Sequence, residues 1–427
     1  MRLSTWLLLA ALLASCGSER RPRRVVLVTL DTLRYDSFDA TMPATRAIAE
    51  GGVIFDGFYS ATSTTQPTHA TLFTGLHPWQ HAVPRNGAIL PQSAETLAER
   101  FQAAGYRTAA VAASFPLERR FGFDQGFDVY RDDFEHFQAN QWNEFEVGGA
   151  FYSLADKVTD KALEELDGAG EGDQFLWFHY YDPHAPYGDT GGGVSTIGQL
   201  YDAAKRGRKA VNRAIQVARA GYDRDVAFLD RALARVLERV LADSDRFETH
   251  VLVTADHGES FGEDNSFGHG KRLTRSQVHI PTFLLSPGVS ARRDANPAGT
   301  IDIPATLLAL SGLPSVGNGA GWNLLDAGPH RPAVMGMRRA FLEPFEDTRA
   351  DGQVEYVQGA RFYVVHEGAL HIGDKDGVES ETGATDAALA AELAVAFSVF
   401  EGELTGQEVE DVAHDPAALE ALKHLGY

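Results

Sequence analysis

Cysteine is almost absent from the sequence: Cys16 is the one cysteine among 427 residues. A single thiol cannot form a disulfide within the chain, so a hydrophobic core must hold the fold together. With 44% hydrophobic residues, the chain can bury a large core and contain more than one structural unit.

Positive charge is also scarce. Lys and Arg number 38 against 59 Asp and Glu, which gives a net charge of -21 at neutral pH. An acidic surface repels nucleic acid and anionic membranes, so no nucleic acid partner is expected. We interpret the Lys and Arg residues in the body of the chain as dispersed rather than clustered.

Long apolar runs are missing as well, and the longest one lies at the N-terminus. Residues 1–15 carry one early positive charge, Arg2, followed by an apolar stretch that is too short to span a bilayer. This pattern is typical of a secretory signal peptide. No other segment has enough uninterrupted apolar residues to cross a membrane.

The signal-like segment ends in Leu13-Ala-Ser-Cys16, which resembles the lipobox of bacterial lipoproteins. In that family the chain is cleaved before the cysteine, which is then acylated. The resemblance implies a lipid on Cys16 and a basic tether over residues 16–24. It also implies a place in the bacterial cell envelope, on the periplasmic or extracellular face, with membrane contact through the lipid anchor only. An incidental cysteine in an ordinary signal peptide is the alternative.

Apolar runs rich in β-branched or aromatic residues recur through the chain, as expected for strands buried on both faces. In open α/β sheets, ligands gather beyond the carboxyl ends of the strands, so polar residues that follow such runs are candidates for a site. Three runs are followed in this way: 24–30 by Asp31, 174–181 by His184, and 249–255 by Asp256 and His257.

Helical patterns alternate with these runs, which predicts an α/β fold with a large, mostly parallel sheet sandwiched between helices. We assign residues 25–329 to this catalytic domain and residues 330–427 to a small C-terminal α+β subdomain. An irregular surface excursion is expected over 121–149. The predicted helices are 42–51, 94–104, 151–166, 303–311, 386–400 and 415–425, together with a long helical region after residue 193 that has residues from Tyr222 to Val240 on one face. The further strands are 53–59, 107–113, 280–286, 334–338, 354–366 and 369–372.

One stretch combines hydroxyl side chains with the signals of a short helix. Thr62 to Thr65 all carry hydroxyls, Pro67 follows, and Gly75 ends an apolar helical pattern. The helix would begin at Thr65, where free backbone N–H groups favour an anion. A hydroxyl held there beside a cation can act as a nucleophile toward a phosphate or sulfate ester. The alternative is that these residues only cap the helix.

The ends of these strands and of this helix should meet. Asp31, Asp256, His257 and the Thr65 hydroxyl would then form a site suited to a hard or borderline divalent cation. His269 follows in a glycine-rich loop. Any one of these histidines could be a structural residue, buried and bonded to a backbone carbonyl. That all of them are structural is much less expected, because each follows an apolar strand.

Six short motifs appear in order along the chain: Val28-Thr-Leu-Asp-Thr-Leu-Arg34, Thr65-Gln-Pro-Thr-His69, Leu72-Phe-Thr-Gly-Leu-His-Pro78, Asp182-Pro-His-Ala-Pro-Tyr187, Thr254-Ala-Asp-His-Gly-Glu259 and His279-Ile-Pro281. Together they resemble the sulfatase family of the alkaline phosphatase superfamily, over residues 24–315. The resemblance implies a large α/β sandwich with a small C-terminal sheet. The end of the chain, 415–427, also resembles the tail of lipoprotein members.

The resemblance implies a role for each matching position. It makes Asp31, Asp256 and His257 metal ligands and places Thr65, a further ligand, at the nucleophile position. The implied cofactor is Ca²⁺, Mn²⁺ or Zn²⁺, as one ion, or two if a further histidine completes a second site. The implied substrate is an anionic ester.

The resemblance also implies roles for four further positions of this chain. His184 falls at the family's active-site histidine, and His269 where relatives have a cationic or metal-binding residue, with Lys271 as a neighbouring candidate. Asn86 falls where phosphodiester-cleaving relatives place an oxyanion-binding amide. His184 or His269 would protonate the leaving oxygen.

Two departures from the family pattern affect the expected chemistry. Sulfatases have a Cys or Ser that becomes formylglycine, followed by an Arg, where this chain has Thr65 and His69. Thr-x-Pro-x-His resembles the motif of nucleotide pyrophosphatases/phosphodiesterases instead. Thr32 also replaces the second carboxylate that many sulfatases have.

We therefore expect a metal-dependent hydrolase that forms a Thr65 ester and favours phosphate esters, diesters above all. A non-catalytic binding protein on the same fold, tethered to the membrane, is the alternative. A phosphoethanolamine-type transferase also fits a threonine nucleophile, but such relatives carry several membrane spans. The oligomeric state is left open.

Overall fold

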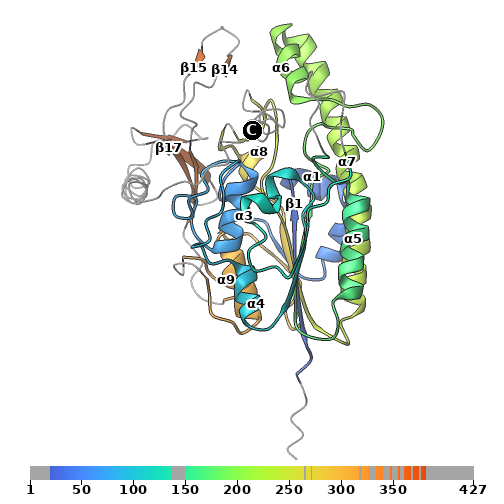
Figure 1. Cartoon of the computed structure of the whole chain (residues 1–427). Helices are drawn as coiled ribbons and strands as arrows, with labels where there is room; N and C mark the ends of the chain where they lie inside the picture. The colour runs from blue at the N-terminus through green and yellow to red at the C-terminus, as the bar shows by residue number, and fades with distance from the viewer. Residues whose placement is uncertain are drawn as a thin grey trace, which may run out of the picture.

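The computed structural model describes most of the chain up to residue 326 and short strands beyond it (Figure 1). Among the described residues, no helix is both long and apolar enough to cross a bilayer. Cys16, Lys271 and the predicted helices 386–400 and 415–425 lie outside the description. The described residues are 20–136, 150–263, 266–270, 272–316, 320–326, 333–339, 347–348, 354–355, 360–366, 369–374 and 377–380.

The central feature is an eight-stranded sheet in the order β11-β2-β10-β7-β1-β6-β4-β5. β1 lies inside the sheet and runs parallel to both of its neighbours, β6 and β7. The predicted α/β fold is thus confirmed. The strands are β1 Arg23–Leu30, β2 Val53–Phe55, β4 Arg107–Val111, β5 Val129–Arg131, β6 Gln174–Tyr180, β7 Glu248–Ala255, β10 Thr282–Leu285 and β11 Arg292–Asp294.

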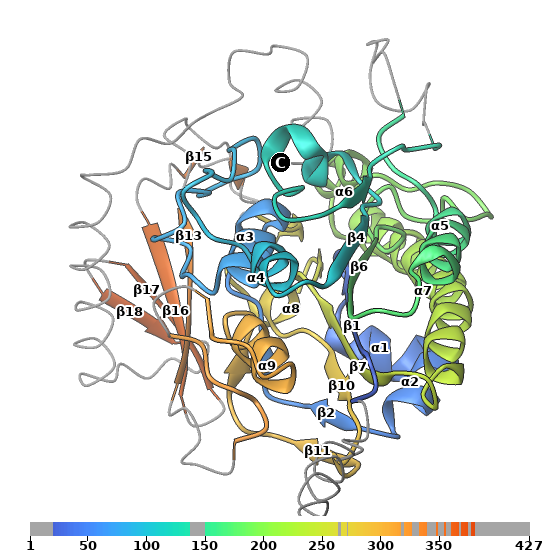
Figure 2. The same ribbon diagram turned by 60° about the horizontal axis from the view of Figure 1, so that its bottom comes forward.

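Helices cover both faces of this sheet, which explains why β1 and β6 are apolar on both sides (Figure 2). One layer contains α3, α4 and α9, and the other contains α1, α2, α5 and the 35-residue α7. The helices are α1 Tyr35–Thr41, α2 Pro43–Ala49, α3 Thr65–Thr74, α4 Leu97–Ala103, α5 Ala155–Gly168, α6 Ile197–Lys205, α7 Arg208–Ala242, α8 Arg275–Val278 and α9 Asp302–Leu310.

The register of the three central strands places the site. Leu30 at the end of β1 pairs with Tyr180 of β6 on one side and Ala255 of β7 on the other. The residues that follow each strand, among them Asp31 and Asp256, therefore leave the same edge of the sheet side by side.

Helix α3 delivers Thr65 to that edge. It spans Thr65–Thr74, begins after the extended residue Thr64, and ends at Gly75, whose φ of 64° is a left-handed conformation that glycine adopts without strain. Every residue of α3 is buried. The prediction for this helix is confirmed at both ends.

Other predictions need correction. The strand expected over 53–59 is two strands, β2 and β3 (Phe58–Tyr59), because the chain turns between them. β10 is antiparallel to both neighbours, β2 and β7. The excursion expected over 121–149 contains β5, which pairs parallel with β4. Helix α1 and strand β11 were not predicted, and both are short; the long helical region expected after residue 193 is two helices, α6 and α7.

Beyond residue 326 the description consists of strands. A second hydrophobic cluster joins these strands to the part of the chain before residue 326, which we call the larger unit. It contains Tyr363, Val365 and Leu370 from the strands and Tyr59, Leu273 and Val278 from the larger unit. The domain boundary at 329/330 stays a prediction. The strands here are β13 Ala333–Arg339, β16 Ala360–His366, β17 Ala369–Asp374 and β18 Gly377–Ser380, in one antiparallel sheet, and the pair β14 Asp347–Thr348 and β15 Val354–Glu355.

Candidate active site

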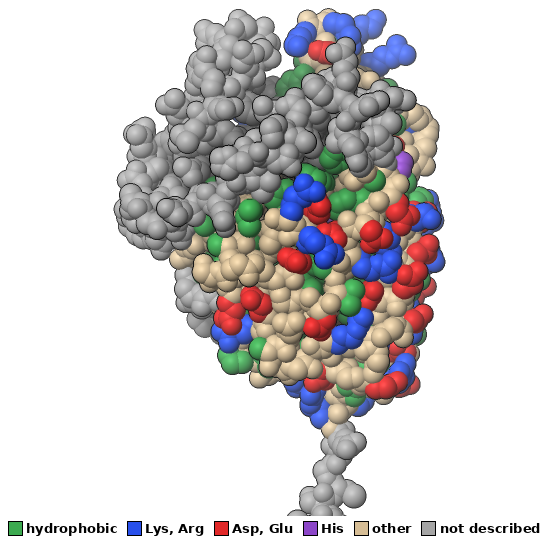
Figure 3. All heavy atoms as spheres, viewed as in Figure 1, with side chains coloured by type: hydrophobic (Ala, Val, Ile, Leu, Met, Phe, Trp, Pro, Cys, Tyr) green, Lys and Arg blue, Asp and Glu red, His purple; other side chains and the backbone are tan. Residues whose placement is uncertain are grey.

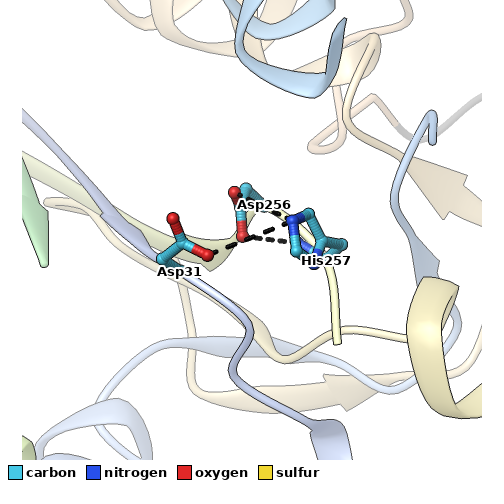
Figure 4. A group of neighbouring side chains, drawn as sticks. All are labelled: Asp31, Asp256 and His257. Carbon is cyan, nitrogen blue, oxygen red and sulfur yellow. Dashed lines mark hydrogen bonds and ion pairs between the residues drawn. The ribbon is translucent and has the colours of Figure 1, made fainter. Parts of the chain in front are cut away.

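Asp31, Asp256 and His257 converge at the carboxyl ends of β1 and β7 (Figure 4). Each offers one ligand atom, and these atoms lie within 4.8 Å of one another. All three side chains are completely buried. Within the described residues, this is the group that could hold a metal ion, as the sequence predicted.

The carboxylates of this group lack the partners that buried acids normally have. Among the described residues, no hydrogen bond is donated to either oxygen of Asp31 or to Oδ2 of Asp256. Oδ1 of Asp256 accepts the backbone N–H groups of Thr32 at 3.1 Å and His257 at 2.7 Å. Burial, followed by the charges of Asp256 and Glu259, raises the pKa of Asp31 well above its usual range. Buried acids with free oxygens fit a divalent cation, which would supply the missing charge.

The turn after β1 is held in an unusual conformation. Thr32 has a φ of 54°, which is uncommon for a β-branched residue because its Cβ crowds the backbone. This conformation aims the Thr32 amide at Asp256. The hydroxyl of Tyr222 on α7 donates to the Thr32 carbonyl at 2.9 Å and accepts the Arg34 N–H at 2.9 Å, so α7 fixes the turn.

Thr65 faces the metal-ligand group from α3. Its Oγ1 lies 3.4 Å from Nε2 of His257. Nδ1 of His257 lies 3.0 Å from the Gly258 carbonyl, which can only accept. The proton is therefore on Nδ1, and the lone pair of Nε2 faces Thr65 and the carboxylates.

Asn86 lies against the first turn of α3. Its Oδ1 accepts the backbone N–H of Gln66 at 2.8 Å, while its Nδ2 is buried and donates no hydrogen bond to a described residue. Gln66 in turn donates to the Pro116 carbonyl at 2.6 Å, which fixes the start of the helix. An amide donor therefore lies beside the first turn of α3, and the anion-binding role predicted for Asn86 stays a prediction.

His184 and His269 lie close to each other, with ring centroids 5.0 Å apart. His269 also lies against His257, at 4.3 Å between ring centroids. Nδ1 of His184 is 2.7 Å from the hydroxyl of Tyr181, and burial lowers the pKa of His184 to about 3. The structure thus brings both predicted histidines to the site, with His184 neutral.

Glu259 is a site residue that sequence reasoning did not single out. It is completely buried, and its Oε1 lies 3.2 Å from Nδ1 of His269 while its Oε2 accepts the hydroxyl of Tyr187 at 2.9 Å. Burial raises its pKa to about 7, although His184, Tyr187 and His257 act in the opposite direction. Its position two residues after His257 was the signal that could have found it.

His179 was also missed. It is the sixth residue of β6, buried, and its Nδ1 accepts the Ala113 N–H at 3.2 Å. The proton is therefore on Nε2, which faces Oδ2 of Asp31 at 3.6 Å. A histidine inside an apolar strand was the available signal.

His69 lies one turn along α3, behind the nucleophile. Its Nδ1 is 2.8 Å from the Thr65 carbonyl and 3.9 Å from Oδ2 of Asp256, and its Nε2 is 3.1 Å from Oγ1 of Thr29. This arrangement suits a residue that positions its neighbours. The catalytic role predicted for His69 stays a prediction, and Lys271 lies outside the described residues.

The model of the Sulfatase family matches residues 23–313 of this chain. The chain belongs to the sulfatase family. The sulfatase YdeN of Escherichia coli K12 is 24% identical over 58% of this chain and 50% of its own length, and the Ulvan-active sulfatase of Formosa agariphila is 25% identical over 64% and 57%. The chain thus spans little more than half the length of these curated relatives.

Solved structures share the fold of this sulfatase-family chain. The phosphonate monoester hydrolase SpPMH from Silicibacter pomeroyi superposes with a TM-score of 0.66 at 19% identity, over 90% of this chain and 96% of that chain. BT1596, a 2-O GAG sulfatase, gives a TM-score of 0.68 at 16% identity, over 93% and 96%. At these identities the likeness establishes the architecture.

Proposed function

We propose that this sulfatase-family hydrolase cleaves phosphate esters, preferably diesters, or sulfate esters through the hydroxyl of Thr65. The observation that supports this best is the position of that hydroxyl. It lies at the first residue of α3, 3.4 Å from Nε2 of His257 and beside two buried carboxylates. The free N–H groups of the first turn favour an anionic ester at the same place.

Asp31, Asp256 and His257 would hold a divalent cation, Ca²⁺, Mn²⁺ or Zn²⁺, with Thr65 next to it. The free, buried oxygens of the two acids support this assignment. When bound, such a cation supplies the charge that lowers the pKa of a neighbouring hydroxyl and polarises the ester.

The residues of the chain then divide the reaction between them. Oγ1 of Thr65 releases its proton to solvent and attacks phosphorus or sulfur, and the bond to the leaving oxygen breaks as the threonyl ester forms. Nδ2 of Asn86 and the first N–H groups of α3 donate to the charged oxygens. His269, held through Nδ1 by Glu259, donates a proton to the leaving oxygen. Water then cleaves the ester at phosphorus or sulfur, which restores the Thr65 hydroxyl and returns a proton to His269.

His184 suits a different role from that of His269. With a pKa lowered to about 3 by burial, it is neutral at neutral pH and a poor proton donor. We therefore assign it to orienting the substrate, together with Tyr181, whose ring stacks on it at 4.4 Å between centroids.

The threonine nucleophile favours phosphate over sulfate. A formylglycine adduct carries a second hydroxyl on the same carbon, so it can release sulfate by collapse of the hemiacetal. A threonyl ester has no second hydroxyl and cannot collapse in this way, so water must cleave it at phosphorus or sulfur. The alternative, a binding protein without turnover, is less well supported, because the acids, His257 and the two further histidines are all in place around Thr65.

Lipid anchoring through Cys16 in the cell envelope remains part of this proposal and rests on the Leu-Ala-Ser-Cys junction.

The decisive experiment is metal analysis of the purified protein together with a panel of aryl phosphate, phosphodiester, phosphonate and sulfate esters. We expect a bound divalent ion and the fastest turnover with diesters. Faster turnover of a sulfate ester than of every phosphate ester would overturn the preference, and no turnover of any ester would favour the binding protein.

A further inference from the structure

The junction of α6 and α7 concentrates positive charge on an otherwise acidic molecule. Five of the nine residues from 205 to 213 are basic, and no acidic residue occurs between 203 and 222. We call these five residues the basic tip, and all of them are exposed. They are Lys205, Arg206, Arg208, Lys209 and Arg213. The interpretation of Lys and Arg as dispersed along the chain was therefore wrong here.

Four of the five charges of the basic tip have no acidic partner among the described residues. Lys205 pairs with Asp202 at 3.2 Å, and none of the other four forms an ion pair with any part of the chain that the structure describes. Figure 3 shows Lys and Arg side chains gathered at the upper end of the molecule, over α6 and the start of α7. Such a surface attracts anions in proportion to their charge.

Helix α6, which ends in the basic tip, contacts strand β9 (Phe267–Gly268) directly before the site residue His269. The hydroxyl of Tyr201 on α6 donates to the carbonyl of Phe267 in β9 at 3.2 Å, and Ile197 lies against Gly268. His269 is the next residue of the chain. Since a helix rises about 1.5 Å per residue, Lys205 begins roughly 6 Å beyond Tyr201 along α6. An extended molecule with one group in the site can therefore reach the tip.

The direction of α7 argues against a membrane partner on the anchored side. Its 35 residues run from the tip for about 50 Å. They end at Ala242, six residues before Glu248, which pairs with Arg23 at the start of β1. The tip and the N-terminal end of the described chain thus lie at opposite ends of the molecule (Figure 1).

We propose that the basic tip is a docking surface for an anionic polymer of sugars or polyols joined by phosphodiesters. The tip holds several charges of the polymer while one diester enters the site. This rests on the proposed preference for phosphate diesters. No residue from 202 to 221 is aromatic, so the tip offers no stacking surface for the bases of a nucleic acid.

The test is a variant that removes four charges from exposed positions: Lys205→Gln, Arg206→Gln, Arg208→Gln and Lys209→Gln. Glutamine keeps the helix propensity of these positions. The matched control removes four exposed charges that lie outside the basic tip: Lys157→Gln, Arg231→Gln, Arg235→Gln and Arg246→Gln. A third variant, Arg206→Lys with Arg208→Lys, keeps the charge.

The probes are fluorescently labelled poly(glycerol phosphate), for binding and hydrolysis, and bis(4-nitrophenyl) phosphate, a diester with a single charge. We expect the tip variant to bind the polymer at least tenfold more weakly and to raise KM for it by a similar factor, with kcat unchanged. Turnover of the small diester should not change. The control and the Lys variant should behave as wild type, and 200 mM salt should weaken wild-type binding far more than tip-variant binding.

Equal binding of the polymer by the tip variant and the control would overturn the proposal. So would tighter binding of a single-stranded oligonucleotide, or of anionic phosphatidylglycerol vesicles, than of poly(glycerol phosphate) of similar charge. The two proposals can fail separately. If wild type does not cleave the small diester, but the tip variant still binds the polymer more weakly than wild type does, the proposed activity is wrong and the docking surface stands.

Discussion

Asp31 and Asp256 bring two carboxyl groups together where water does not reach them. Burying one unpaired charge costs several kcal/mol, so two such carboxylates facing each other must gain a cation or a proton. Burial and its acidic neighbours raise the pKa of Asp31, which favours a proton there when no cation is bound. His179, with its Nε2 3.6 Å from Asp31, supplies a polar contact but little positive charge, because burial lowers its pKa well below the usual range.

The first prediction concerns Thr65. Thr65→Ala should lower turnover of phosphodiesters by several orders of magnitude, because it removes a group that acts in the chemical step. Thr65→Ser should keep part of the activity, since the hydroxyl remains. Steady-state kinetics on both variants, with bound metal measured as a control, provides the check. Undiminished turnover in Thr65→Ala would remove the nucleophile from the mechanism.

The second prediction separates positioning by Glu259 from a purely structural role. Glu259→Ala should slow alkyl phosphodiesters by about 10² or more, and nitrophenyl diesters much less, because good leaving groups need little protonation by His269. Glu259→Gln keeps the acceptor for Nδ1 of His269 and should recover part of the rate. An equal loss for both kinds of leaving group, with a lower melting temperature, would show that Glu259 only supports the fold.

Among the elements, those with local signals were predictable. Helix α3 begins and ends where Thr65, Pro67 and Gly75 indicate, and β1 and β7 follow from continuous apolar runs. The strands β5 and β11 have three residues each and are fixed by pairing with distant partners, which no local pattern records.

The same distinction applies to the site. Asp31, Asp256 and His257 were predictable because they directly follow buried strands. The contacts of His179 with Asp31 and of Glu259 with His269 depend on strand register and on the fold of the loop after β7. Such contacts are tertiary, so the residue types alone did not reveal them.

The third prediction belongs to the start of helix α5. Oδ1 of Asp182 accepts the Ala155 N–H at 2.9 Å, and Oδ2 is buried without a hydrogen-bond partner among the described residues. Burial raises the pKa of Asp182 to about 8. Between its usual pKa and about 8, the folded state therefore binds a proton that the unfolded state has lost. The free energy of unfolding should fall as pH rises through this window, by at most about 1.4 kcal/mol per pH unit.

Asp182→Asn keeps the acceptor for Ala155 and has no proton to lose. Its stability relative to wild type should increase from pH 5 to pH 8 and then level off. Urea unfolding of both proteins at several pH values measures this difference. A difference that does not change with pH would show that Asp182 is ionised in the folded state.

For the whole molecule, the fourth prediction concerns its attachment. Wild type expressed in a bacterium that lipidates such proteins should partition into the detergent phase, because acyl chains on Cys16 bury apolar surface there. Cys16→Ser should be released from the membrane or retained unprocessed. Mass spectrometry of the mature N-terminus is the check, and an unmodified Cys16 in the aqueous phase would contradict the anchor.

The fifth prediction links the metal to the stability of the larger unit. A cation held by Asp31, Asp256 and His257 joins β1 to β7 at the centre of the sheet, so it binds the folded state alone. An ion at 100 times its Kd would add about 2.7 kcal/mol to the free energy of unfolding. For a unit of more than 150 residues, its removal by a chelator should lower the melting temperature by roughly 5–10 °C.

Variants separate this effect from ordinary destabilisation. Asp31→Asn should lose the bound ion and its response to the chelator, yet without metal it should be at least as stable as wild type, because it removes a buried charge. Asp230→Asn is the control, because Asp230 is buried and accepts the N–H groups of Ala44 at 3.0 Å and Thr45 at 2.7 Å, away from the site. It should melt earlier but respond fully to the chelator. If Asp31→Asn keeps both the ion and that response, the cation is held elsewhere, and Asp31 must reach its folded state by binding a proton instead.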